Sequence, residues 1–309
     1  MTSPSTQRRL GRLRQGGGVS DRTLALLLVL PTAVLLLAFS VYPFLQAARD
    51  SLYTIPVATR EATWTGLDNY RELFRQESIR AAFGRTLIWT VSNVVVQTAL
   101  GLAIALLLNA RLRGQSIARG LVIFPYMVPA VVVAAVFRFT MNDITGIANY
   151  LWMKLPWVDE PIYFLSDPDI VLLVVTLVNC WKYTPFMVIV LLARLQTVPT
   201  ELYEAARIDG AGARHLFWYV TLPWIMPVLL VALLLRTIWT ANDFDVIYLL
   251  AFGGPLGATT TVPIEIRRLA FSQEDLGLAS ALAVVMALFV ALASFVYLRL
   301  YHRSEAHLQ

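Results

Sequence analysis

Six long apolar runs, separated by short polar segments, dominate the chain. A bilayer core of roughly 30 Å needs about 20 predominantly apolar residues per helix, so each run is a candidate span. The runs cover residues 23–48, 86–110, 120–137, 170–193, 215–242 and 276–298. Barrel strands alternate over roughly 10 residues, whereas these runs are longer and apolar on every face. The pattern therefore predicts an all-α polytopic membrane protein with six transmembrane helices.

The polar segments divide the chain into a membrane domain and two tails. Residues 1–22 are rich in Arg and contain three consecutive glycines, a composition typical of a flexible cytoplasmic tail. We expect residues 23–301 to form the transmembrane domain and residues 302–309 a cytoplasmic C-terminal tail. Within an external segment at 49–85, the stretch from Thr65 to Phe74 predicts a turn and a short amphipathic helix, with Leu73 and Phe74 resting on the membrane-embedded body.

The distribution of arginine predicts the orientation, because flanking cations resist translocation. An N-in/C-in topology keeps most arginines of the short loops in the cytoplasm and places the acidic loop around Asp159 and Glu160 outside. The external segment 49–85 also carries arginines, but five acidic residues are interleaved with them, as in a small folded unit.

Composition supports this class and limits the chemistry. The chain is 58% hydrophobic and 15% charged, against about 25% charged residues in soluble domains. The net charge of +5 is explained by basic residues at membrane boundaries, so we expect the lipid bilayer and no nucleic acid as a partner. A single cysteine, Cys180, excludes an intrachain disulfide.

Prolines interrupt several of the apolar runs. In membrane helices such prolines often mark bends that line a cavity, where neighbours and water satisfy the freed carbonyls. They are Pro31, Pro43, Pro125, Pro129, Pro185, Pro223 and Pro227.

The sequence contains no recognisable catalytic, metal or phosphate-binding constellation. Neither lysine follows the glycine pattern of a P-loop, and the three histidines lack metal-ligand spacing. Asp167 and Asp169 resemble the acidic pairs of glycosyltransferases, but a loop turn before a helix explains them equally well. We therefore expect no catalytic residue, no metal and no cofactor in this chain.

A short cytoplasmic helix is predicted within the loop 195–222, between the fourth and fifth runs. Thr200 can cap its N-terminus, Glu201 and Glu204 favour its positive end, and Gly210 and Gly212 can end it. Two small residues, Ala205 and Ala206, leave its surface open to another protein.

This loop resembles the EAA loop of binding-protein-dependent ABC import permeases. The matching residues are Glu204-Ala-Ala206, Asp209-Gly-Ala211 and Thr221-Leu-Pro223. In that family the loop forms a coupling helix that docks in a groove of a separate ATPase subunit. The coupling residues implied here are Glu201, Glu204, Ala205, Ala206, Asp209, Gly210 and Gly212.

Other stretches are similar to the carbohydrate branch of that family, the maltose-type and glycerol-phosphate-type permeases. They are Gly66–Tyr70, Phe124–Pro129, Trp181–Phe186, Leu195–Pro199, Asn242–Tyr248 and Gly253–Pro255. The chain departs from the usual pattern at Ala251-Phe252 and at Arg267-Arg268.

The resemblance implies a multi-pass permease of the bacterial inner membrane that performs no bond chemistry. It implies a second homologous permease, two ATP-binding ABC subunits that hold ATP and Mg, and an extracytoplasmic solute-binding protein. The cargo would be a sugar, an oligosaccharide or a polyol, with a sugar or glycerol phosphate left open. The alternatives are an ion-coupled secondary transporter and a membrane glycosyltransferase.

Charged and aromatic residues inside the fourth and fifth runs mark a candidate solute pathway. A buried membrane lysine costs about 2.5 to 3.5 kcal/mol, so Lys182 should face a wet or paired interior. Polar groups fix sugar hydroxyls and rings cover apolar sugar faces. Structural Lys182–Asp243 or Arg236–Asp243 pairs are the competing interpretation. The candidate residues are Trp181, Lys182, Tyr183, Phe186, Arg236, Trp239, Asn242 and Asp243.

Overall fold

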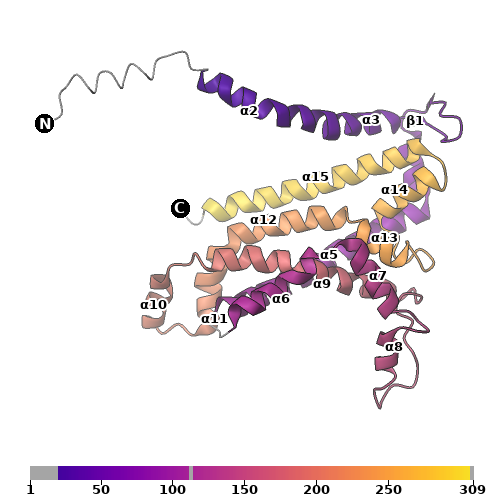
Figure 1. Cartoon of the computed structure of the whole chain (residues 1–309). Coiled ribbons are helices and arrows are strands. Elements are labelled where there is room, and N and C mark those ends of the chain that lie inside the picture. Colours follow the sequence, from indigo (N-terminus) through magenta and orange to yellow (C-terminus); the bar gives the residue numbers. More distant parts are fainter. Residues whose placement is uncertain (1–19, 111–113, 307–309) are drawn as a thin grey trace, which may run out of the picture.

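Apolar runs with few charges form long helices, because a helix satisfies every backbone polar group within its own segment. The computed structural model describes residues 20–110 and 114–306, and these are mainly helical, with two short strands (Figure 1). This confirms the all-α polytopic fold class. Most of the predicted N-terminal tail at 1–22, and the last three residues of the C-terminal tail, lie outside the described residues.

Among the described residues, five helical segments are long and apolar enough to cross a membrane. They are Arg22–Asp50, Glu77–Asn109, Val171–Leu195, Ala213–Ala251 and Leu276–Arg299. The elements that build them are α2 (Asp21–Leu36), η1 (Leu37–Val41) and α3 (Tyr42–Asp50), then α5 (Glu77–Asn109), α9 (Val171–Leu195), α11 (Ala213–Leu216), η2 (Phe217–Thr221), α12 (Leu222–Ala241), α13 (Asp245–Ala251) and α15 (Leu276–Ala306).

The third apolar run is broken rather than straight. It forms α6 (Gln115–Met127) and α7 (Ala130–Thr140), which are bent by 93°. Val128 is extended, with φ −73° and ψ 129°, because the ring of Pro129 disfavours the α conformation in the residue before it. The expected single span at 120–137 is therefore corrected to a broken one, and the chain has up to six crossings if this pair counts as a span.

Short strands and helices connect the spans. Strands β1 (Tyr53–Thr54) and β2 (Thr63–Trp64) pair antiparallel, and α4 (Asp68–Arg75) is the expected amphipathic helix. Leu73 is buried as predicted, but Phe74 is 66% exposed, so only one of the two residues rests on the body. The remaining short helices are α8 (Ile147–Trp152), α10 (Thr200–Ile208) and α14 (Val262–Phe271).

Close packing of α5 against α9 forms the centre of the bundle. A Cβ on Gly101 of α5 would lie 2.5 Å from the Cβ of Met187 on α9, so only glycine permits this approach. The first span contacts the rest of the bundle mainly through α3, which packs against α15. The helices α10 and α11 lie at one end of the bundle, and α13 and α14 lie at the other (Figure 1).

Candidate solute cavity and coupling loop

The loop between the fourth and fifth spans folds into the expected short helix, α10. The expected cap is wrong, because Thr200 is the first helical residue and Pro199 occupies the capping position. Pro199 adopts φ −59° and ψ 133°, and no side chain caps the helix. Because the φ of proline is fixed, the helix begins at Thr200, one residue earlier than it would if the Thr200 hydroxyl capped it.

The end of α10 agrees with the prediction at Gly210. Its φ of +82° is in the left-handed region, where glycine has no Cβ to clash. Gly210 N donates to Arg207 O at 3.0 Å, and Ala211 N donates to Ala206 O at 2.9 Å. This pair of bonds is a Schellman motif. Gly212 instead begins the next helix, as the N-cap of α11.

The surface of α10 is open along most of its length. The predicted coupling residues Glu201, Glu204 and Ala205 are exposed, Ala206 is partly buried, and Ile208 is 87% exposed. The Tyr203 hydroxyl lies 3.0 Å from the Thr221 hydroxyl, which ties the helix to the base of the fifth span. A partner protein could therefore contact α10 and act directly on that span.

A cavity of about 310 Å³ lies at the opposite end of α12 from this loop. Its size is at the lower end of the range for small-molecule sites. The lining residues are Tyr126, Tyr183, Arg236, Trp239, Thr240, Asn242, Asp243, Phe244 and Asp245. Five of the eight predicted pathway residues therefore meet here, whereas Trp181, Lys182 and Phe186 do not line the cavity.

The Arg236 guanidinium is held by protein groups. Its Nε donates to Gln97 Oε1 at 2.7 Å and its Nη2 to Thr240 Oγ1 at 3.1 Å. The same group lies 4.8 Å from the Tyr183 ring centroid, and the residue is only 3% exposed. These contacts compensate a charge that burial would otherwise make costly.

Buried amides connect Arg236 to Asp243. Gln97 Nε2 donates to Asn179 Oδ1 at 3.1 Å, and Asn179 Nδ2 donates to Asp243 Oδ2 at 2.6 Å. Within the described part of the chain, the ion pairs closer than 4.0 Å are Arg71–Asp68 and Arg268–Glu265. Direct Lys182–Asp243 and Arg236–Asp243 pairs do not form, and the amides take their place.

The sequence reasoning missed these amides, although a signal was present. Gln97 Nε2 also donates to Asn93 Oδ1 at 3.2 Å, one helical turn away on α5. Two amides four residues apart lie on one helix face, and such polar residues in a membrane run usually face the bundle interior. Tyr126, Thr240, Phe244 and Asp245 of the cavity wall were also missed, because they come together only through the fold.

The three remaining candidates have supporting positions. The Lys182 ammonium donates to the carbonyl of Val128, at the break between α6 and α7. The Phe186 ring meets the Trp239 ring edge-on at a centroid distance of 5.1 Å, so it supports a lining residue. Trp181 packs edge-on against Phe137 and lines a separate apolar groove.

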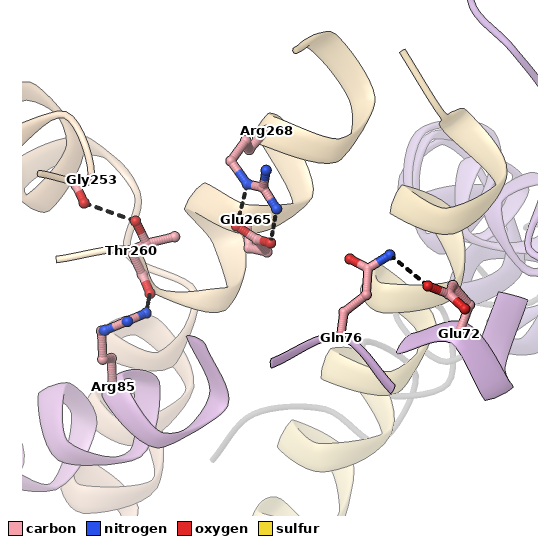
Figure 2. Close-up of polar contacts among 7 residues, drawn as sticks. All are labelled: Glu72, Gln76, Arg85, Gly253, Thr260, Glu265 and Arg268. Atoms are coloured by element: carbon pink, nitrogen blue, oxygen red, sulfur yellow. Dashed lines mark hydrogen bonds and ion pairs between the residues drawn. The ribbon is translucent and has the colours of Figure 1, made fainter. Parts of the chain in front are cut away.

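Polar contacts link α14, the loop before it and α5 (Figure 2). Arg268 Nε donates to Glu265 Oε2 at 2.7 Å, and this carboxylate raises the pKa of the Arg268 guanidinium above its ordinary value. Arg85 Nη1 donates to Thr260 O at 3.3 Å, and Thr260 Oγ1 donates to Gly253 O at 2.8 Å. These bonds fasten the loop after α13 to α5.

The departures from the usual family pattern lie in this region and have partners within the chain. Phe252 has a positive φ of 53°, and the Arg138 guanidinium lies 4.5 Å from its ring centroid. Arg267 lies 4.7 Å from the Tyr248 ring centroid. Phe252 and Arg267 thus each take part in a cation–π contact, and Arg268 forms the ion pair with Glu265.

The acidic pair before the fourth span is explained by a turn. Asp167 Oδ1 accepts a hydrogen bond from Asp169 N at 2.9 Å, which is the geometry of an Asx-turn. Among residues 20–110 and 114–306, no three His, Cys, Asp or Glu side chains gather to hold a metal ion.

Comparisons with known proteins agree on one family. The family described as "Binding-protein-dependent transport system inner membrane component" matches residues 97–308, more than half of the chain. The trehalose/maltose transport system permease protein MalF of Thermococcus litoralis is 35% identical over 90% of this chain and 94% of its own length. The sulfoquinovosyl glycerol permease SmoG of Agrobacterium fabrum is 33% identical over 95% of both chains.

Solved structures share the fold. A chain of a bacterial ABC transporter involved in the import of alginate superposes with a TM-score of 0.78, covering 91% of this chain and 95% of its own. At 24% identity this likeness concerns the fold alone.

These findings confirm a multi-pass inner-membrane protein and a transport subunit rather than an enzyme. They argue against the two alternative functions, an ion-coupled secondary transporter and a membrane glycosyltransferase. The chain belongs to the family of binding-protein-dependent transport system inner membrane components, in its sugar ABC permease branch.

Proposed function

We propose that this chain forms one half of the pathway through an ATP-driven importer for a sugar, an oligosaccharide or a polyol. The cavity beside α12 is the main support, because it combines four aromatic side chains with hydrogen-bonding groups. Rings can cover the apolar faces of a sugar while amides and carboxylates bind its hydroxyls. Related permeases named for trehalose/maltose and sulfoquinovosyl glycerol transport support the same solute class.

In this proposal a second, homologous permease supplies the opposite wall. Two ATPase subunits bind ATP and Mg, since this chain has no P-loop. A solute-binding protein delivers cargo at the end with α13 and α14. One related structure is of an alginate transporter in complex with a pentasaccharide-bound periplasmic protein, which fits such a delivery step. The N-in/C-in orientation then places the loop 195–222 in the cytoplasm and the segment 49–85 outside.

The loop from Glu201 to Gly212 is the proposed entry point for the energy of ATP hydrolysis. A partner that moves α10 also moves the fifth span, because Tyr203 contacts Thr221 and only the Gly210–Gly212 turn separates α10 from α11. The cavity wall lies at the far end of that span. Closure of the ATPase subunits could therefore change which side of the membrane the cavity opens to.

The test is Gly210→Val in the complete importer. The left-handed φ at this position disfavours any β-branched residue, so the end of α10 should be distorted. We expect uptake and solute-stimulated ATP hydrolysis to be lost while membrane insertion is retained. Gly120→Val is the matched control, because Gly120 is an exposed residue of α6 and a Cβ added there would meet no atom within 4 Å. Normal stimulation in Gly210→Val would refute the coupling role.

A further inference from the structure

We propose that the cavity beside α12 accepts uncharged polyhydroxylated solutes and excludes anionic ones. The lining holds two carboxylates, Asp243 and Asp245, and one guanidinium, Arg236, so its formal net charge is −1. This assignment rests on the proposed function and narrows the solute class of the same cavity. It separates this chain's cargo from the acidic sugars named for some of its relatives.

Three of the nine lining residues are charged, and two of these are carboxylates. Asp243 Oδ2 accepts a hydrogen bond of 2.6 Å from the neutral Asn179 amide. Asp245 is an exposed residue in the first turn of α13. Neither carboxylate has an ion-pair partner within 4.0 Å among the described residues. Both can therefore accept hydrogen bonds from solute hydroxyls, but both would repel a phosphate, sulfonate or carboxylate group.

The cations nearby are occupied by protein groups. Arg236 is 3% exposed, donates to Gln97 and Thr240, and covers the Tyr183 ring. Lys182 is 4% exposed, donates to the Val128 carbonyl and lies 5.0 Å from the Tyr183 ring centroid, behind that ring and not in the lining itself. An anionic solute would have to displace these contacts to reach a positive charge, and a buried polar group left unpaired is costly.

The rest of the wall suits a neutral sugar. Tyr126, Tyr183, Trp239 and Phe244 contribute rings, and the Tyr126 and Tyr183 rings meet edge-on at a centroid distance of 6.0 Å. Asn242 is exposed, and its Nδ2 already donates to Ile238 O at 2.8 Å, which leaves its amide oxygen as a further acceptor of hydroxyl protons. The wall thus offers acceptors at Asp243, Asp245 and Asn242 beside the neutral hydroxyl and indole donors of Tyr126, Tyr183 and Trp239, a mixture that suits hydroxyl groups, which both donate and accept.

Pairs of solutes that differ only in a phosphate group test directly whether the cavity excludes anions. Trehalose and maltose are each compared with their 6-phosphates, using saturation-transfer NMR titrations on the complete importer. We expect the phosphorylated sugar of each pair to bind at least ~10-fold more weakly, because like charges in a confined site repel strongly. The Asp243→Asn/Asp245→Asn double variant should narrow the difference to about 3-fold or less. Asp159→Asn/Glu160→Gln removes the same number of carboxylates from an exposed loop outside the cavity and should preserve the difference.

The outcomes separate this inference from the proposed function. Equal or tighter binding of the phosphorylated sugars overturns the exclusion of anions, for example through a cation of the second permease, and leaves carbohydrate import intact. A difference that persists in the double variant overturns the role of the two carboxylates. Failure of every neutral sugar in a wider panel of mono- and disaccharides and polyols overturns the proposed function itself.

Discussion

Replacing Lys182 by Met tests whether this residue positions the cavity wall or touches the solute. The ammonium satisfies the carbonyl of Val128, which the break at Pro129 leaves without a helical partner. Tyr126, two residues before Val128, lines the cavity and meets the Tyr183 ring. Lys182→Met keeps an unbranched side chain that is one atom shorter, and removes the donor and the charge.

Two opposing terms determine the effect on stability. A hydrogen bond to a charged group contributes about 1.5 to 3 kcal/mol. A lysine in the middle of a membrane helix costs about 2.5 to 3.5 kcal/mol, which the substitution removes. The terms nearly offset, so we expect the free energy of unfolding to change by no more than about 2 kcal/mol. The break between α6 and α7 nevertheless loses its anchor, and Tyr126 loses its fixed position.

The expected functional loss follows from that aromatic contact. An aromatic pair is worth about 0.5 to 1.5 kcal/mol, so solute affinity should fall by roughly 2- to 12-fold. Lys182→Gln, which retains a neutral donor, should recover part of the loss. Binding is measured by titration of the complete importer, and folding by thermal unfolding in detergent.

A double-mutant cycle with Tyr126→Ala separates the two roles of Lys182. If Lys182 acts through the bend, Lys182→Met should add little to the loss already caused by Tyr126→Ala. Additive losses would mean that Lys182 contacts the solute itself. Unchanged affinity in Lys182→Met would refute the reasoning altogether.

Two further substitutions test the close packing of α5 against α9 and the hydrogen bond between Gln97 and Arg236. Gly101→Ala should destabilise the protein by about 1 to 3 kcal/mol in thermal unfolding, because the new methyl group would overlap Met187. The control is Gly84→Ala, which should be neutral or stabilising because a Cβ there would meet no atom within 4 Å. Gln97→Leu should cost about 1.5 to 3 kcal/mol, because the buried Arg236 guanidinium loses the acceptor of its Nε and keeps only its bond to Thr240. A Gln97→Leu melting temperature equal to that of the parent would show that Arg236 does not depend on this amide.

Local patterns were sufficient for the elements that depend on local physics. The apolar runs predicted the spans, because a lipid-exposed helix needs length and hydrophobicity more than any particular partner. The end of α10 at Gly210 was also predictable, since the left-handed turn is a property of glycine itself. Thr200 was misplaced as a cap because the adjacent Pro199 competes for the same position.

The cavity was only partly predictable. Charges and rings in the fourth and fifth runs pointed to Tyr183, Arg236 and Asp243, because such residues are costly in lipid. The order of residues along the chain does not indicate which of these side chains line the same cavity. Lys182 was chosen for the same reason as Arg236, yet it holds the Val128 carbonyl instead of lining the cavity.

The sequence by itself determined the membrane class, the number of apolar runs, the short helix that ends at Gly210 and the family, since these rest on hydrophobic length, proline and glycine chemistry, and motif order along the chain. The tertiary structure decided which polar groups meet. The packing of α6 against α9 brings Tyr126 beside Tyr183, and Gln97 and Asn179 link Arg236 to Asp243 across three helices. The physical reason is that a buried polar group takes whichever partner the packing of the helices places within hydrogen-bond distance, and sequence separation does not encode that distance.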